Sequence, residues 1–117
     1  MYAYYLVPGP VRNITAFSAI RNVTLTWLAP LVKHGQVYYN VTYRDTDGPD
    51  NQTKHFGETN QTSIVIHGLE EYILYQFMIQ SFTTEGGNGP TSFIMIRTFA
   101  SGKDLKVFMV NITINPI

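Results

Sequence analysis

Six asparagines in this chain are each followed, two residues later, by threonine. The positions are Asn13, Asn22, Asn40, Asn51, Asn60 and Asn111. Asn-x-Ser/Thr with x other than proline is the acceptor sequence for asparagine-linked glycosylation, which adds a bulky, solubilising glycan at a protein surface. The chain has eight asparagines and eighteen serine or threonine residues among 117, so chance predicts about one such site. The excess favours a secreted or cell-surface protein over a threonine-rich chain that forms these sequences by accident.

Few other residues have the types expected of a chemical site. The candidate metal ligands are His34, His55, His67, Asp45, Asp47 and Asp50. The histidines fall in a turn, a weak strand and an outward strand position, and no cysteine or carboxylate cluster accompanies them. The aspartates are spaced like part of a calcium-binding loop, but the glycine and the closing glutamate of such a loop are missing. We therefore predict solvent-exposed histidines and no metal or cofactor site.

The chain also lacks the marks of a catalytic centre. It has no nucleophile–base pair, paired-carboxylate motif or cofactor fingerprint, so an enzyme is the weaker alternative. No helix is expected after the glycine-rich run 85–90, which therefore reads as a hairpin turn and not as a phosphate-binding loop. Eight basic and eight acidic residues give no net charge, so we predict no nucleic-acid partner. No apolar run approaches the roughly 20 residues of a membrane-spanning helix, so direct membrane insertion is not expected.

Composition and periodicity favour one all-β domain. Eight tyrosines, seven phenylalanines and many valine, isoleucine and threonine residues are typical of strands. No long segment has the apolar period of a helix, and the absence of cysteine excludes a disulfide scaffold. The predicted strands cover residues 11–19, 22–28, 37–45, 53–58, 62–67, the second half of 68–83, and 92–98. Seven short strands separated by turn residues predict a two-sheet antiparallel immunoglobulin-like sandwich.

The stretch 68–83 is the centre of this arrangement. Its second half alternates with a period of two, which places Tyr75, Phe77 and Ile79 on one face of a long strand. Leu69 and Tyr75 stand six residues apart across a chain corner, a spacing that suits a tyrosine whose hydroxyl reaches back to upstream backbone. A buried tryptophan removes about 150–250 Å² from water. The predicted structural core contains Trp27, Tyr39, Tyr43, Leu69 and Tyr75.

The opposite faces of the strands carry the predicted functional residues. The acceptor asparagines at 13, 22 and 40 fall on outward positions, and those at 51 and 60 fall in turns. The outward positions of the central and last strands are unusually apolar: Leu74, Met78, Phe82, Phe93 and Met95. On neighbouring strands these side chains form one contiguous patch, which is typical of a contact surface. Scattered surface residues, combined with a register error of one residue, are the alternative.

Several marks, in order along the chain, resemble the fibronectin type III domain. They are Pro10, Val23-Thr-Leu-Thr-Trp27 with Pro30, Tyr39-Asn-Val-Thr-Tyr43-Arg44, Gly68-Leu69 with Tyr75, Gly89-Pro90-Thr-Ser92, and Arg97-Thr98. Two features depart from the family: Glu71 stands where proline is common, and the last strand looks a residue short. The resemblance implies a domain at 8–99, with an N-terminal extension at 1–7 and a C-terminal tail, or the start of a following segment, at 100–117. The loop 85–90 lacks the Arg-Gly-Asp that some members use for integrin binding.

The resemblance implies a non-catalytic spacer or interaction module. The alternative functions differ in whether this module lies outside the cell or in the cytosol. The excess of acceptor sequences favours a glycosylated receptor or adhesion ectodomain, similar to those of receptor-type tyrosine phosphatases. A cytosolic scaffold module, of the kind found in giant muscle proteins, is the alternative. A cytokine-receptor half needs a Trp-Ser-x-Trp-Ser motif, which a chain with one tryptophan lacks. The expected partners are neighbouring domains, another protein, or a second copy bound through the sheet face or the tail.

Overall fold

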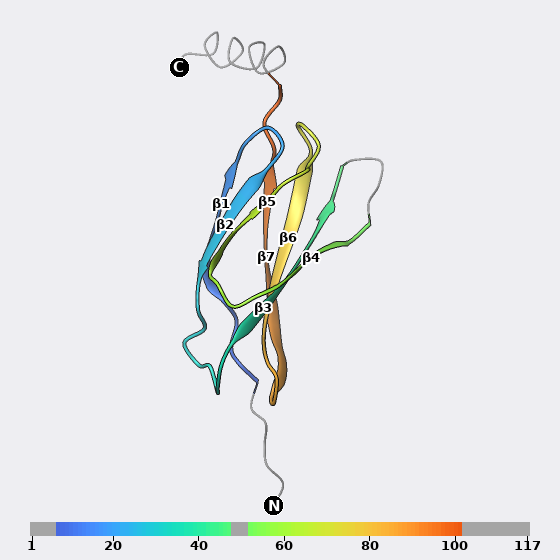
Figure 1. The fold of residues 1–117 in the computed structure, drawn as a ribbon. Coiled ribbons are helices and arrows are strands. Elements are labelled where there is room, and N and C mark those ends of the chain that lie inside the picture. Colours follow the sequence, from blue (N-terminus) through green and yellow to red (C-terminus); the bar gives the residue numbers. More distant parts are fainter. Residues whose placement is uncertain (1–6, 48–51, 102–117) are drawn as a thin grey trace, which may run out of the picture.

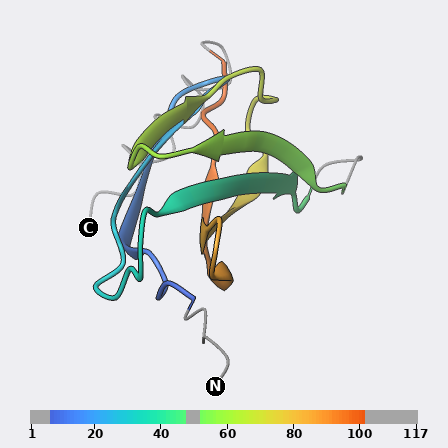
Figure 2. The same ribbon diagram turned by 60° about the horizontal axis from the view of Figure 1, so that its bottom comes forward.

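The computed structural model describes residues 7–47 and 52–101 as a β-sandwich without helices in these ranges. Its strands are β1 (Arg12–Ser18), β2 (Val23–Leu28), β3 (Tyr38–Asp45), β4 (Lys54–Thr59), β5 (Ser63–Ile66), β6 (Leu74–Thr83) and β7 (Gly87–Arg97). They form a three-stranded sheet, β1-β2-β5, and a four-stranded sheet, β4-β3-β6-β7, with antiparallel pairing (Figure 1). Figure 2 shows β3 and β4 side by side. The prediction of an all-β, seven-stranded antiparallel sandwich is confirmed.

The core lies between the two inner faces, where alternation buries every second side chain. Trp27 on β2 is 1% exposed and meets the Tyr39 ring of the other sheet edge-on, with ring centroids 5.3 Å apart. On β6, Tyr75, Phe77 and Ile79 are buried, and Leu69 closes the core before the strand. Tyr43 is only half-buried, and its ring packs against Tyr75 and Phe77 at the margin of the core. These inner rows place the remaining side chains of each strand on the outside.

The predicted hairpin at 85–90 is present, but its turn is shorter and the last strand is longer than predicted. The turn covers only residues 84–86, because β7 begins at Gly87 and pairs with β6 from its first residue. Gly87 has a φ of 92°, which side chains with a Cβ rarely adopt. A Cβ at Gly89 would collide with the carbonyl oxygen of Pro8 and crowd the Ser81 hydroxyl. These glycines therefore allow a turn and a close chain crossing beside the register shift that the β6–β7 pairing makes between Gln80 and Phe82.

Candidate interaction surface and glycan acceptors

The corner between β5 and β6 is held by the hydroxyl of Tyr75. Its oxygen accepts a hydrogen bond from the backbone N–H of Glu70 at 2.9 Å. The bend uses left-handed backbone at Gly68 (φ 76°) and Tyr72 (φ 53°). Burial raises the pKa of the Tyr75 hydroxyl above its ordinary value, and the hydrogen bond from Glu70 opposes that rise. Tyr75 thus has the inward ring and upstream backbone contact of a tyrosine corner, which is a structural arrangement.

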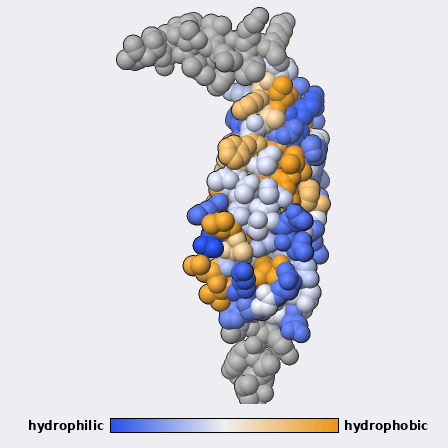
Figure 3. Space-filling model, turned by 60° about the vertical axis from the view of Figure 1, so that its left-hand side comes forward, coloured by the Kyte–Doolittle hydropathy of each residue, from blue (hydrophilic) through white to orange (hydrophobic). Residues whose placement is uncertain are grey.

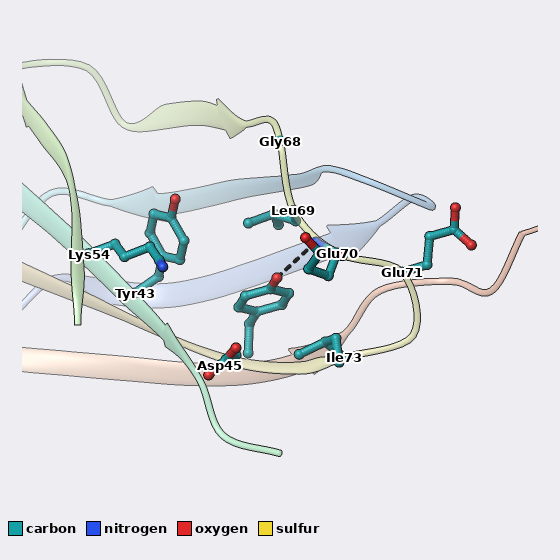
Figure 4. A pocket seen from close by; sticks show the side chains of 9 residues that line it. Tyr43, Asp45, Lys54, Gly68, Leu69, Glu70, Glu71 and Ile73 are labelled. Atoms are coloured by element: carbon teal, nitrogen blue, oxygen red, sulfur yellow. Dashed lines mark hydrogen bonds between the residues drawn. The ribbon is translucent and has the colours of Figure 1, made fainter. Parts of the chain in front are cut away.

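A pocket of about 280 Å³ lies beside this corner (Figure 4). Its lining includes Tyr43, Asp45, Lys54, Glu70, Glu71 and Ile73. One carboxylate oxygen of Asp45, Oδ1, is buried and accepts no hydrogen bond within the described ranges. The lining offers carboxylates and tyrosine hydroxyls but no histidine, serine or threonine to act as a nucleophile or a matched base. The corner pocket therefore suggests no reaction.

The turn after β3 is tied to β6 and β7 by a charged contact that the sequence did not predict. The Asp47 Oδ1 atom accepts a hydrogen bond from the Leu74 N–H at 2.9 Å, and its Oδ2 lies 2.8 Å from the Arg97 guanidinium. The same guanidinium stacks over the ring of Tyr72 at 4.7 Å from the centroid. The Leu74 N–H, followed by Arg97, lowers the pKa of Asp47. No sequence signal reveals this contact, because Leu74 and Arg97 lie 27 and 50 residues from Asp47 in the chain.

The other candidate ligands do not converge. His34, His55 and His67 are exposed on separate segments, and His34 lies in a turn with a φ of 57°. Within residues 7–47 and 52–101, no group of three or more histidine, aspartate or glutamate residues is arranged to hold a metal ion. Asp50 lies outside the described residues. The same ranges contain no helix with the length and apolar character needed to cross a membrane.

Four of the six glycan acceptors fall on described residues, and all four lie outside the core. Asn13 and Asn60 are exposed, whereas Asn22 and Asn40 are half-buried. Asn13 has a φ of 51° and lies where the β1–β2 pairing slips, so its strand bulges at the acceptor. Asn60 lies in the turn between β4 and β5. Asn51 and Asn111 lie outside the described residues, as does the part of the predicted tail beyond residue 101.

The predicted apolar patch lies on the outer face of the four-stranded sheet. Phe93 and Met95 on β7 are 61% and 43% exposed. The three β6 members, Leu74, Met78 and Phe82, are half-buried and alternate with the buried inner row. Met78 pairs directly with Phe93, whereas Leu74, Phe82 and Met95 lie opposite polar residues on the same face. We call this surface, with Tyr38, Asn40, Thr42 and Arg44 of β3, the outer face.

The three-stranded sheet has no comparable grouping. Phe17 and Val65 are exposed on its outside, but Thr24 lies between them in the pairing. Figure 3 brings forward the side of the molecule where β1 and β2 lie, and shows apolar side chains as separate spots among polar ones. Single exposed apolar side chains are normal for a protein surface. The outer face of the four-stranded sheet is therefore the better candidate for contact.

The sequence profile of the Fibronectin type III domain matches residues 9–97. The chain belongs to the fibronectin type III family. It is 27% identical over 95 residues to Neogenin of Rattus norvegicus, and this match covers 80% of the chain and 7% of Neogenin. It is 32% identical over 80 residues to receptor-type tyrosine-protein phosphatase F of Danio rerio, covering 66% of the chain and 4% of that protein. The matched region is thus a small part of each curated relative.

Solved structures share the fold of this chain. Domains A168–A170 from titin superpose with a TM-score of 0.68 at 21% identity, covering 80% of this chain and 32% of the titin chain. A likeness at this identity shows the shared fold alone. The chain is therefore a fibronectin type III module with relatives among cell-surface receptors, and such modules are generally non-catalytic.

Proposed function

We propose that residues 8–99 form a non-catalytic spacer and protein-interaction module in the glycosylated ectodomain of a larger cell-surface receptor or adhesion protein. The carrying observation is that all four described acceptor asparagines lie outside the core, on both sheets and in turns. A glycan of this bulk needs an outward attachment point, and each of these positions supplies one. The receptors among the relatives support this location. The apolar outer face supplies the contact surface, toward a neighbouring domain, a partner protein or a second copy.

A cytosolic scaffold module is the rival function, because the same sandwich fold also occurs in titin. The two functions differ in whether the acceptor asparagines are glycosylated. A cytosolic chain meets no oligosaccharyltransferase, so its acceptor sequences remain unmodified, whereas an ectodomain displays the module outside the cell and carries glycans.

The test uses cells that make the natural protein and an antibody raised against this chain. We expect the antibody to label intact, unpermeabilised cells, and we expect peptide N-glycosidase to shift the recognised band to lower mass. Labelling that appears only after permeabilisation, together with an unshifted band, would identify the cytosolic scaffold instead. An antibody against a known cytosolic protein is the control for membrane integrity. Peptide mapping after the glycosidase, which converts occupied asparagines to aspartates, then identifies the occupied positions.

A further inference from the structure

Asn40 lies in the middle of the outer face, with polar residues directly opposite it on both neighbouring strands and apolar side chains on the diagonals. It pairs across the sheet with Gln80 of β6 and with Glu58 of β4. Residues on the diagonals of a cross-strand pair lie about 7–8 Å away, so Met78 and Phe82 flank Asn40 on β6. Along β3, Tyr38 and Thr42 are its nearest neighbours on the same face. The acceptor amide therefore lies next to two apolar members of the patch on β6, Met78 and Phe82.

A pair of aromatic rings lies on the outer face next to this acceptor. The rings of Tyr38 and Phe82 lie with centroids 5.7 Å apart and planes tilted by 30°. Both side chains are only half-buried, so part of each ring remains open to solvent on the outer face. A pyranose ring of the N-acetylglucosamine type presents C–H groups on its faces, and such groups pack well on aromatic rings. The pair therefore has the chemistry of a sugar platform.

Two polar side chains of the outer face, Gln80 and Arg44, already make hydrogen bonds, but the Asn40 amide does not. The Gln80 side chain donates a hydrogen bond to the Gly89 carbonyl at 2.9 Å, and the Arg44 guanidinium donates to Gln76 at 2.9 Å. The Asn40 amide makes no hydrogen bond to another residue of the described chain, and neither of its polar atoms is buried without a partner. It is therefore positioned to carry a substituent without breaking an existing contact.

We infer that the N-glycan of Asn40 folds back on the outer face, with its first sugars packed on Tyr38, Phe82 and Met78. This inference rests on the proposed function, because it requires export and glycosylation. The glycan covers the half of the patch on β3 and β6, where it is attached. Met95 lies further along the sheet, opposite Gln76, and stays uncovered. The outer face is thereby divided into a sugar-covered half and an open half on β7 available for protein contact.

The test compares glycan removal from the two sheets of the complete chain, secreted from eukaryotic cells with an added signal peptide. Asn40→Gln and Thr42→Ala each destroy the acceptor on the outer face, whereas Thr42→Ser keeps it. Asn13→Gln removes one glycan from the three-stranded sheet and is the matched control. The readouts are the melting temperature and the fluorescence of anilinonaphthalene sulfonate, a dye that binds exposed apolar surface. A second arm treats the folded wild type with one of two enzymes. An endoglycosidase leaves a single N-acetylglucosamine on each occupied asparagine, whereas peptide N-glycosidase removes the whole glycan.

Loss of the Asn40 glycan should raise dye fluorescence about twofold and lower the melting temperature by about 4 °C. Thr42→Ser should change neither, and Asn13→Gln should leave the dye fluorescence unchanged. Because Asn13 has a φ of 51°, which glutamine tolerates less well than asparagine, the control for melting temperature is Thr15→Ala, which removes the same glycan and should leave the melting temperature unchanged. Retention of a single N-acetylglucosamine should preserve most of the protection, and because the protein is already folded, this arm does not depend on the variants folding. A glycosylated Asn13 beside an unmodified Asn40 would overturn the inference and leave the proposed function standing. So would equal effects of the Asn40 and Asn13 variants. Complete absence of glycans from the secreted chain would instead contradict the proposed function itself.

Discussion

The two faces of β6 are both rich in apolar side chains, but they meet different surroundings. On the inner face, Tyr75, Phe77 and Ile79 are at most 5% exposed and contact the opposite sheet. On the outer face, the half-buried Met78 and Phe82 are separated by Gln80 and lie beside no second layer of the described chain. The comparison shows that alternation identifies which row is inward, but alternation alone does not determine what covers the outward row.

The largest effect on the free energy of unfolding should come from a substitution in the core. Trp27→Ala removes the largest buried side chain and leaves a cavity beside Tyr39. We expect a loss of about 3–5 kcal/mol in the free energy of unfolding, measured by urea denaturation. Phe17→Ala is the matched control, because Phe17 is 68% exposed on the adjacent strand, and its effect should stay within about 0.5 kcal/mol. A Trp27→Ala loss below about 1 kcal/mol would show that this ring is not in the core.

An intermediate effect is expected at the corner that leads into β6. Tyr75→Phe keeps the buried ring but leaves the Glu70 N–H without its acceptor. The expected loss is about 1–2 kcal/mol in the same measurement. Tyr72→Phe is the control, since Tyr72 is half exposed and its hydroxyl makes no hydrogen bond within the described chain. Equal stability of the two variants would remove the structural role assigned to the Tyr75 hydroxyl.

The pKa of Tyr75 adds a pH dependence to this variant. Burial raises that pKa above its ordinary value of 10.0, so the folded state favours the neutral hydroxyl. The associated stability is complete below pH 10.0 and is lost as the pH rises through the folded pKa. The difference in stability between wild type and Tyr75→Phe should therefore shrink in strongly alkaline buffer.

The smallest effect on stability should come from a substitution on the outer face. In protein made in bacteria, which lacks glycans, Met78→Lys places a charge in the middle of the apolar patch. We expect weaker self-association in sedimentation and a change in unfolding free energy below about 1 kcal/mol, because an outward residue contributes little to the core. Met95→Lys tests the β7 half of the patch in the same way. Unfolding of the Met78 variant would show that the outer row packs as a core, and unchanged association would reduce the patch to ordinary surface.

The sequence predicted those parts of the molecule in which a local pattern determines the outcome. Alternation in β2 and β6 identified the inner rows, and the spacing of Leu69 and Tyr75 identified the corner. The start of β7 was missed because its glycines were interpreted as turn residues, although Gly89 is required by the close passage of Pro8. The contact of Asp47 with Leu74 and Arg97 was missed because it joins three distant segments. Alternation placed Asn40 outward, but its position between Met78 and Phe82 required the pairing of β3 with β6.

The crossing of Pro8 over Gly89 has a mechanical consequence. At this end of the molecule the Ser81 hydroxyl donates a hydrogen bond to the Gly9 carbonyl at 2.6 Å, next to where the described chain begins. At the opposite end, the Phe99 N–H donates to the Ala19 carbonyl and the Ser18 hydroxyl donates to the Arg97 carbonyl (Figure 1). A tensile load between residues 7 and 101 would pull the first and last strands in opposite directions along the long axis. These hydrogen bonds at the two ends of the sandwich would then be loaded together in shear.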